Sequence, residues 1–166
     1  MRSQGIEMKK FFNESVAQWL TLAARLLLGG VLFAAGYLKA TNSAQAAAAV
    51  RVYRILPISL ANSFGYALPW IEIGIALLLI MGIWVRYSAL AGGTLMAIFI
   101  LAIGQAWARN LAINCGCFGN GGVSADGKVH PWVYLAEILR DIGLLITAGY
   151  LYRFPHGKFG LDRLGE

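Results

Sequence analysis

Residues 88–107 read SALAGGTLMAIFILAIGQAW, twenty residues without a charged side chain. About 20 apolar residues in a helix cross the roughly 30 Å hydrocarbon core of a bilayer. Three further apolar stretches of this length lie at 17–38, 66–85 and 132–152. The whole chain is 58% hydrophobic and 13% charged, whereas soluble domains average about 45–50% and about 25%. The sequence therefore predicts an all-α polytopic membrane protein, a single four-helix transmembrane bundle over residues 1–166.

The tryptophans support these span boundaries. Amphipathic rings settle at the headgroup level of a bilayer, and all five fall within about a turn of a predicted span end: Trp19, Trp70, Trp84, Trp107 and Trp132. Only Arg86-Tyr87 separates the second span from the third. This short gap predicts a tight helical hairpin.

The distribution of Lys and Arg predicts the orientation. Four spans place both termini on one side, with Arg2, Lys9, Lys10, Arg86, Arg153, Lys158 and Arg163, against Lys39, Arg51, Arg54, Arg109 and Lys128 on the other. Lys9 and Lys10 precede the first helix, which usually dominates orientation. We therefore expect a cytoplasmic (inner) membrane protein with cytoplasmic termini, starting at Met1 or Met8. The net charge of +6 fits attraction to anionic lipid headgroups, and no motif indicates nucleic-acid binding.

The connection between the first and second spans has a helical composition. Residues 42–56 are rich in alanine, which favours helix, and Pro57 stops such a helix. We expect a short helix on the outer surface, either covering the loop after the third span or acting as a plain connector. Lys39 ends the first span and is expected to snorkel outward.

Both cysteines lie in one motif, Asn114-Cys115-Gly116-Cys117-Phe118-Gly119, in the loop between the third and fourth spans. Gly116 has no Cβ and so permits a very small disulfide ring, and strained exposed disulfides tend to be oxidising. An extracytoplasmic loop allows lasting disulfides, and the nearby cations Arg109 and Lys128 favour the reactive thiolate. The motif indicates redox chemistry at Cys115 and Cys117, with soft-metal binding or a structural bridge as alternatives.

Five ionisable residues fall inside the predicted spans: Arg25, Glu72, Glu137, Arg140 and Asp141. Charges inside a bilayer are costly, so they usually face the bundle interior and pair with one another. By depth, we expect Arg140 to meet Glu72 or Glu137, and Arg25 to lie nearer Asp141. The group is either a proton path or polar pocket for a redox partner such as a quinone, or a set of ion pairs that fixes helix register.

The chain resembles the methylamine-utilisation, MauE-like branch of the DoxX-related membrane proteins over about residues 22–151. The elements that carry the resemblance are Gly36-Tyr37-Leu38-Lys39, Tyr53-Arg54-Ile55-Leu56-Pro57, Leu68-Pro69-Trp70-Ile71-Glu72, Cys115-Gly116-Cys117-Phe118-Gly119 and Leu139-Arg140-Asp141. The resemblance implies a redox-associated four-helix membrane protein that acts beside a thioredoxin-like protein in maturing a disulfide-rich periplasmic enzyme. It implies that Cys115 and Cys117 are the exchanging pair, and it leaves Lys39, Glu72 and Arg140 as family-pattern positions without an assigned role.

Three functional hypotheses follow. The preferred one is a membrane thiol–disulfide redox protein that exchanges electrons with an extracytoplasmic thioredoxin-like partner or supports maturation of a disulfide-containing enzyme. Four-helix disulfide-generating enzymes that use quinones generally carry a second cysteine pair, so here either one pair does both jobs or the second belongs to a partner. The alternatives are a non-catalytic accessory or assembly subunit of a larger membrane respiratory or dehydrogenase complex, and binding of a soft metal by the cysteine pair.

Overall fold

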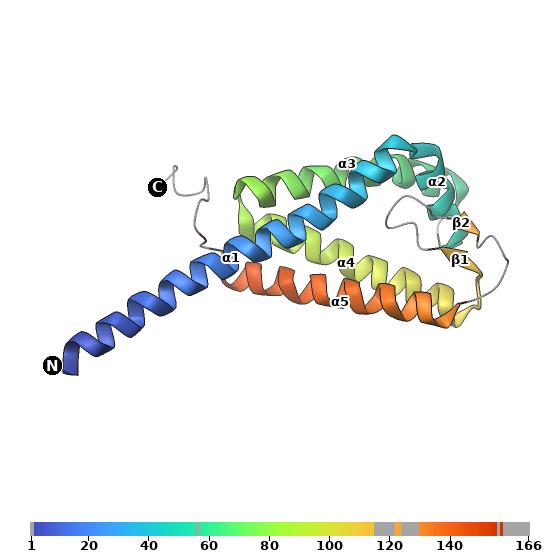
Figure 1. Ribbon diagram of the computed structural model, residues 1–166. Helices are drawn as coiled ribbons and strands as arrows, with labels where there is room; N and C mark the ends of the chain where they lie inside the picture. The colour runs from blue at the N-terminus through green and yellow to red at the C-terminus, as the bar shows by residue number, and fades with distance from the viewer. Residues whose placement is uncertain (1, 56, 115–121, 124–129, 156, 158–166) are drawn as a thin grey trace.

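The computed structural model describes residues 2–55, 57–114, 122–123, 130–155 and 157, and side-chain surroundings are described for these residues from 16 onward except 114, 122 and 123. Its elements are α1 (Arg2–Thr41), α2 (Ser43–Val52), α3 (Ile58–Met81), α4 (Val85–Ala108), β1 (Ile113–Asn114), β2 (Gly122–Val123) and α5 (Pro131–Arg153) (Figure 1). The predicted all-helical architecture is confirmed, with one two-stranded hairpin of two residues per strand as an addition. Cys115 and Cys117 lie outside the described residues.

Three of the described helices are long and apolar enough to cross a membrane: Val16–Thr41, Ile58–Met81 and Val85–Ala108. The first and third agree closely with the predicted spans 17–38 and 88–107. Helix α5 has 23 residues, so its length also suffices, but three ionisable residues interrupt its apolar sequence. The membrane character of the chain therefore rests on three helices, and a fourth span at α5 remains a prediction.

The predicted second span, 66–85, was wrong at both ends. Helix α3 begins at Ile58, with Pro57 as its N-cap, and ends at Met81. Pro69 falls in the first turn of the predicted span, where proline is well tolerated, yet it lies buried inside α3. Trp70 is exposed in the middle of the same helix and not at a span end, where it was expected.

The tight hairpin lies at Gly82–Trp84, four residues before the predicted Arg86-Tyr87. Gly82 ends α3 in the left-handed conformation with φ 71°, and Trp84 precedes α4 with φ 48°. Left-handed backbone is nearly free of strain for glycine alone, so Gly82 is the residue that permits this turn. The sequence correctly predicted a tight turn between these two helices but placed it too late in the chain.

Arg25 of α1 closes the end of α3 at this turn. Its Nε donates to the Leu79 carbonyl oxygen at 2.9 Å and its Nη2 donates to the Ile80 carbonyl oxygen at 3.1 Å. These carbonyls belong to the last turn of a helix, where intrahelical donors are missing. Arg25 is 1% exposed, which confirms that it faces the bundle. Arg25 was expected to lie nearer Asp141, but Asp141 lines a cavity together with Lys39, fourteen positions farther along α1.

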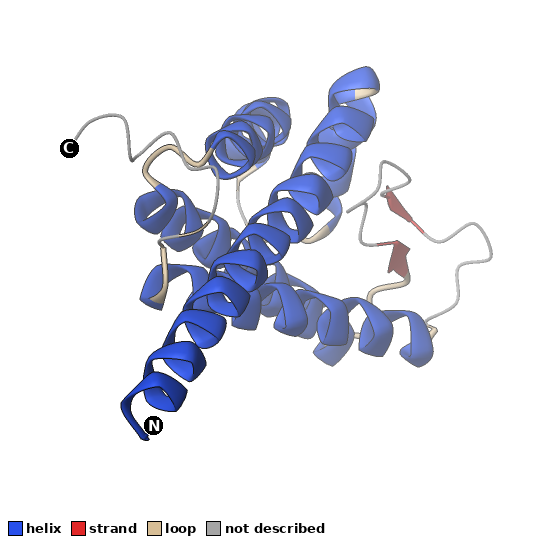
Figure 2. Cartoon of the chain, turned by 60° about the vertical axis from the view of Figure 1, so that its left-hand side comes forward, coloured by secondary structure: helices blue, strands red, loops and turns tan. Residues whose placement is uncertain are grey.

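The long helices form two tight pairs, α1 with α3 and α4 with α5, while contacts between the pairs are sparser. Figure 2 shows α1 lying obliquely across the other helices. A common apolar core joins the pairs, including Leu28, Leu32, Leu79, Ala89 and Leu144. The first residues of α1, the end of α5 and the α3–α4 turn lie at one end of the bundle, and α2 and the β1–β2 hairpin lie at the other (Figure 1).

The predicted short helix between the first two spans is confirmed as α2. It packs on α3 so closely that a Cβ at Gly65 would lie 2.4 Å from the Ala47 Cα. It also contacts β2, which pairs with β1 through Ile113 opposite Val123. The contact with β2 favours the interpretation that α2 lies against the loop after the third span.

Candidate functional site

A buried ion pair joins α1 to α3. Lys39 Nζ lies 2.5 Å from Glu72 Oε1, with the two residues 5% and 0% exposed. The expected snorkelling of Lys39 to the surface is therefore wrong. Glu72, one of the two partners expected for Arg140, pairs with Lys39 instead. The pairing follows from the close approach of the two helices, since a Cβ at Gly36 would lie 2.9 Å from the Pro69 carbonyl oxygen.

A second ion pair is formed by neighbouring residues of α5. Arg140 Nε and Nη2 donate to Asp141 Oδ1 at 2.9 and 2.7 Å, and Asp141 is 1% exposed. Glu137 lies half-buried one turn earlier on α5. The sequence predicted Glu72 or Glu137 as the partner of Arg140, and it did not predict the pairing of adjacent residues.

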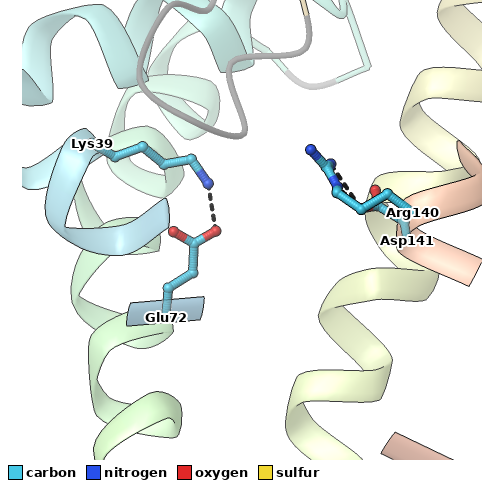
Figure 3. A network of polar contacts seen from close by, with 4 residues as sticks. All are labelled: Lys39, Glu72, Arg140 and Asp141. Atoms are coloured by element: carbon cyan, nitrogen blue, oxygen red, sulfur yellow. Dashed lines mark hydrogen bonds and ion pairs between the residues drawn. The ribbon is translucent and has the colours of Figure 1, made fainter. Parts of the chain in front are cut away.

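The two pairs face each other across the interface between the helix pairs (Figure 3). All four residues, Lys39, Glu72, Arg140 and Asp141, line one small cavity of about 20 Å³; we call them the polar cluster. A cavity of this size holds about one water molecule. Glu72 Oε2 and Asp141 Oδ2 are buried without a hydrogen-bond partner among the described residues. The polar cluster thus retains open acceptor positions deep in the bundle.

A larger cavity of about 350 Å³ adjoins the polar cluster. Its walls are almost entirely apolar and come from α2, α3 and α4, including Ala46, Ala49, Phe64, Leu68, Ile98 and Ala102; we call it the apolar cavity. Lys39 and Phe99 line both cavities, and Lys39 Nζ lies 5.1 Å from the Phe99 ring centroid. The two cavities therefore meet at a lysine ammonium group set against an aromatic face.

The β1–β2 hairpin, at the same end of the bundle as α2, is held to α5 by Tyr134. The Tyr134 hydroxyl donates to the Leu111 carbonyl oxygen at 2.5 Å and accepts from the Ile113 N–H at 3.1 Å. Trp107 stacks on the Tyr134 ring with centroids 6.2 Å apart. Tyr134 thus fixes the strand that leads into the cysteine motif. Sequence reasoning missed it, because nothing in the local pattern distinguishes a tyrosine that binds a loop from one that packs.

The structure separates Arg25 from the other predicted intramembrane residues. Lys39 follows Arg25 by fourteen positions along α1, a rise of about 21 Å. Arg25 therefore lies at the α3–α4 turn. Glu72, Arg140 and Asp141 instead come together with Lys39, which was expected at the surface. Cys115 and Cys117 remain outside the described residues, and only the strands on either side of their segment are placed.

The chain is similar to known proteins of one family. The family model described as methylamine utilisation protein MauE matches residues 17–154. Over 73 residues the chain is 41% identical to the methylamine utilization protein MauE of Methylorubrum extorquens, a match that covers 43% of this chain and 39% of that relative. No solved structure matches the chain. The wider DoxX relationship stays a prediction, but because the family model covers most of the chain, the chain belongs to the MauE family of methylamine utilisation proteins.

Proposed function

We propose that the protein is a membrane thiol–disulfide redox protein in which Cys115 and Cys117 exchange electrons with an extracytoplasmic thioredoxin-like partner. Through this exchange it supports maturation of a disulfide-containing enzyme. Membership of a family named for methylamine utilisation supports an accessory role in amine utilisation. Cys115-Gly116-Cys117 supports the redox chemistry, since these are the only two cysteines of the chain.

The observation that carries the proposal is the attachment of the β1–β2 hairpin at the end of the bundle opposite the start of α1 and the end of α5 (Figure 1). Strands β1 and β2 bracket the cysteine segment, and Tyr134 binds the backbone immediately before β1 and at its first residue. A thiol pair on a fixed base outside the helices suits docking with a soluble partner.

The exchange conserves electrons and atoms. A thiolate of the pair attacks the disulfide of the partner, and one partner sulfur leaves as a thiolate. The second cysteine then attacks the mixed disulfide, so the partner gains two electrons and Cys115–Cys117 becomes the disulfide. The reverse sequence reduces this pair and oxidises the partner.

We propose α5 as the fourth span of a single membrane domain with cytoplasmic termini. Its charged groups turn inward, as Asp141 shows, whereas its outward side is apolar: Leu135, Leu139, Ile142 and Ile146 are exposed. This distribution fits the rule that ionisable residues in membrane helices face the bundle interior. With four spans, the hairpin lies on the side opposite the termini, where disulfides persist.

The proposal is tested by trapping the mixed disulfide. Cys117→Ser and Cys115→Ser variants are expressed in the native membrane and purified without reductant, and the double variant serves as the control. One single variant should carry a thioredoxin-like protein as a reductant-sensitive adduct that the double variant lacks. Recovery of no adduct from either variant, with copurification of a large dehydrogenase complex by the wild type and all variants, would instead support the accessory-subunit function.

A further inference from the structure

We propose that the apolar cavity binds a quinone, with its ring at Lys39 and its apolar tail toward the lipid between α3 and α4. This inference rests on the proposed function, because the quinone would accept the electrons of the cysteine pair. The volume of the cavity, its opening toward the lipid, its single polar end and its charge balance favour this occupant.

The cavity has the size and wall chemistry of a ligand site. Its volume of about 350 Å³ falls in the range of roughly 300–1,000 Å³ typical of small-molecule pockets, which are mostly apolar with a few polar groups. Small side chains keep it open on two sides, Ala46 and Ala49 from α2 and Ala102 from α4. A flat ring fits such a space.

The cavity is open toward the lipid. Phe64 and Ile71 of α3 and Ile98 of α4 line it, and each is also exposed on the outer surface of the helices. These two helices also make fewer contacts with each other than either makes with its main partner. A lipid-soluble molecule can therefore enter sideways from the bilayer.

The polar end of the cavity supplies a hydrogen-bond donor. An ammonium group has three N–H donors, and the described hydrogen bond of Lys39 uses one of them, toward Glu72. Phe99 lies against the same ammonium group. The carbonyl oxygen of a quinone can accept a hydrogen bond from the Lys39 ammonium group, and the quinone ring can pack against Phe99.

Charge and depth favour a neutral head over a lipid headgroup. The polar cluster contains two cations and two carboxylates, so its formal charge is zero. Glu72 lies nine residues before the end of α3, a rise of about 13 Å from the turn, so the cluster is well inside the bundle. A phosphate or fatty-acid carboxylate would bring an uncompensated charge to that depth, which is costly.

The redox step balances with a quinone as oxidant. Two S–H bonds of the cysteine pair break, one S–S bond forms, and two electrons and two protons convert the quinone to a hydroquinone with two new O–H bonds. Glu72 Oε2 and Asp141 Oδ2 offer positions beside the proposed ring site that take up the thiol protons and pass them to the quinone oxygens. Helix α2, which contacts β2, forms one wall of the cavity, so the site lies at the same end of the bundle as the hairpin.

Binding is measured with decylubiquinone on full-length protein in nanodiscs, using a Cys115→Ser/Cys117→Ser background so that no thiol chemistry contributes. Ala102→Phe fills the apolar cavity, whereas its neighbour Leu101, exposed on the outer surface, provides the matched control Leu101→Phe. We expect saturable binding that Ala102→Phe weakens by about tenfold or more and Leu101→Phe changes by less than about twofold. If Ala102→Phe does not fold, Ile98→Trp narrows the same cavity from its exposed rim.

Two outcomes would overturn the inference: no saturable binding, or equal affinity in the cavity variant and the control. Full displacement of decylubiquinone by phosphatidylglycerol would also overturn it in favour of a lipid site. The binding experiment tests the quinone site independently of the proposed thiol exchange. Partner exchange without decylubiquinone binding contradicts only the quinone site, and binding without partner exchange contradicts only the thiol chemistry.

Discussion

Lys39 and Glu72 form an ion pair in the interior of the protein, with Nζ and Oε1 2.5 Å apart. The pair connects the last turn of α1 to the interior of α3 and faces the Arg140–Asp141 pair across the bundle (Figure 3). Because each pair is neutral, four ionisable residues are accommodated where single charges would be costly. Loss of one partner of a pair would therefore leave a buried charge without compensation.

Removing one member of the Lys39–Glu72 pair should destabilise the protein more than removing both. Lys39→Met leaves a buried carboxylate uncompensated, a change that costs about 3–5 kcal/mol in buried pairs. The double variant Lys39→Met/Glu72→Leu should regain most of that loss. Thermal unfolding in detergent measures both, with the exposed Arg86→Met as the control for loss of a cation. Equal losses in the single and double variants would show that the pair is not coupled.

Gly82→Ala should strongly destabilise the α3–α4 turn. A Cβ at this position would lie 2.1 Å from Arg25 Nη2, and its φ of 71° is unfavourable for alanine. We expect a loss of at least about 1–2 kcal/mol. At Gly74 a Cβ meets nothing within 4 Å, so Gly74→Ala should be neutral or slightly stabilising. A wild-type unfolding temperature for Gly82→Ala would contradict the described closure of α3 by Arg25.

Gly65→Ala should loosen α2 from α3, because the new Cβ would lie 2.4 Å from backbone Cα of Ala47. Limited trypsin digestion reports this change, since Arg51 and Arg54 are exposed in and just after α2. Cleavage at these two sites should become several-fold faster than in the wild type. Gly104→Ala on α4, where a Cβ meets nothing within 4 Å, should leave the cleavage rate unchanged. Identical rates in both variants would contradict the close α2–α3 packing.

Tyr134→Phe should release the base of the hairpin while keeping the ring stacked on Trp107. The variant loses the hydroxyl bonds to Leu111 and Ile113, worth about 1 kcal/mol each. Amide hydrogen exchange at Ile113 should accelerate by about tenfold or more. Tyr152→Phe removes a hydroxyl bonded to Arg86 at the opposite end and should not alter exchange at Ile113. An unchanged exchange rate in Tyr134→Phe would show that other contacts hold the hairpin.

The sequence predicted those elements whose signals are local. The uncharged stretch 88–107, the alanine-rich segment before Pro57 and the apolar stretch 132–152 all correspond to observed helices. Pro69 misled the prediction because a proline inside a packed membrane helix looks, in one dimension, like a proline at a helix start. Neighbouring helices can satisfy the backbone group that it leaves unpaired.

The candidate site was predictable only in part. Hydropathy identified Glu72, Arg140 and Asp141 as costly residues that need partners, but pairing depends on helix rotation and on how closely the helices approach. For Lys39 the sequence-based prediction failed. A lysine at a span end usually snorkels, whereas here the close packing at Gly36 turns it inward. The apolar cavity depends on three helices meeting, which no single segment reveals.

The most direct test of thiol exchange is the redox cycle of the cysteine pair in intact cells. Because the chain has two cysteines, a membrane-impermeant maleimide that shifts gel mobility reports on Cys115 and Cys117 alone. After a brief pulse of reductant, both thiols should label without permeabilising the cells, and after washout the pair should return to the unlabelled, oxidised state. Labelling only after permeabilisation, or a pair that stays oxidised throughout, would contradict exchange at the extracytoplasmic face.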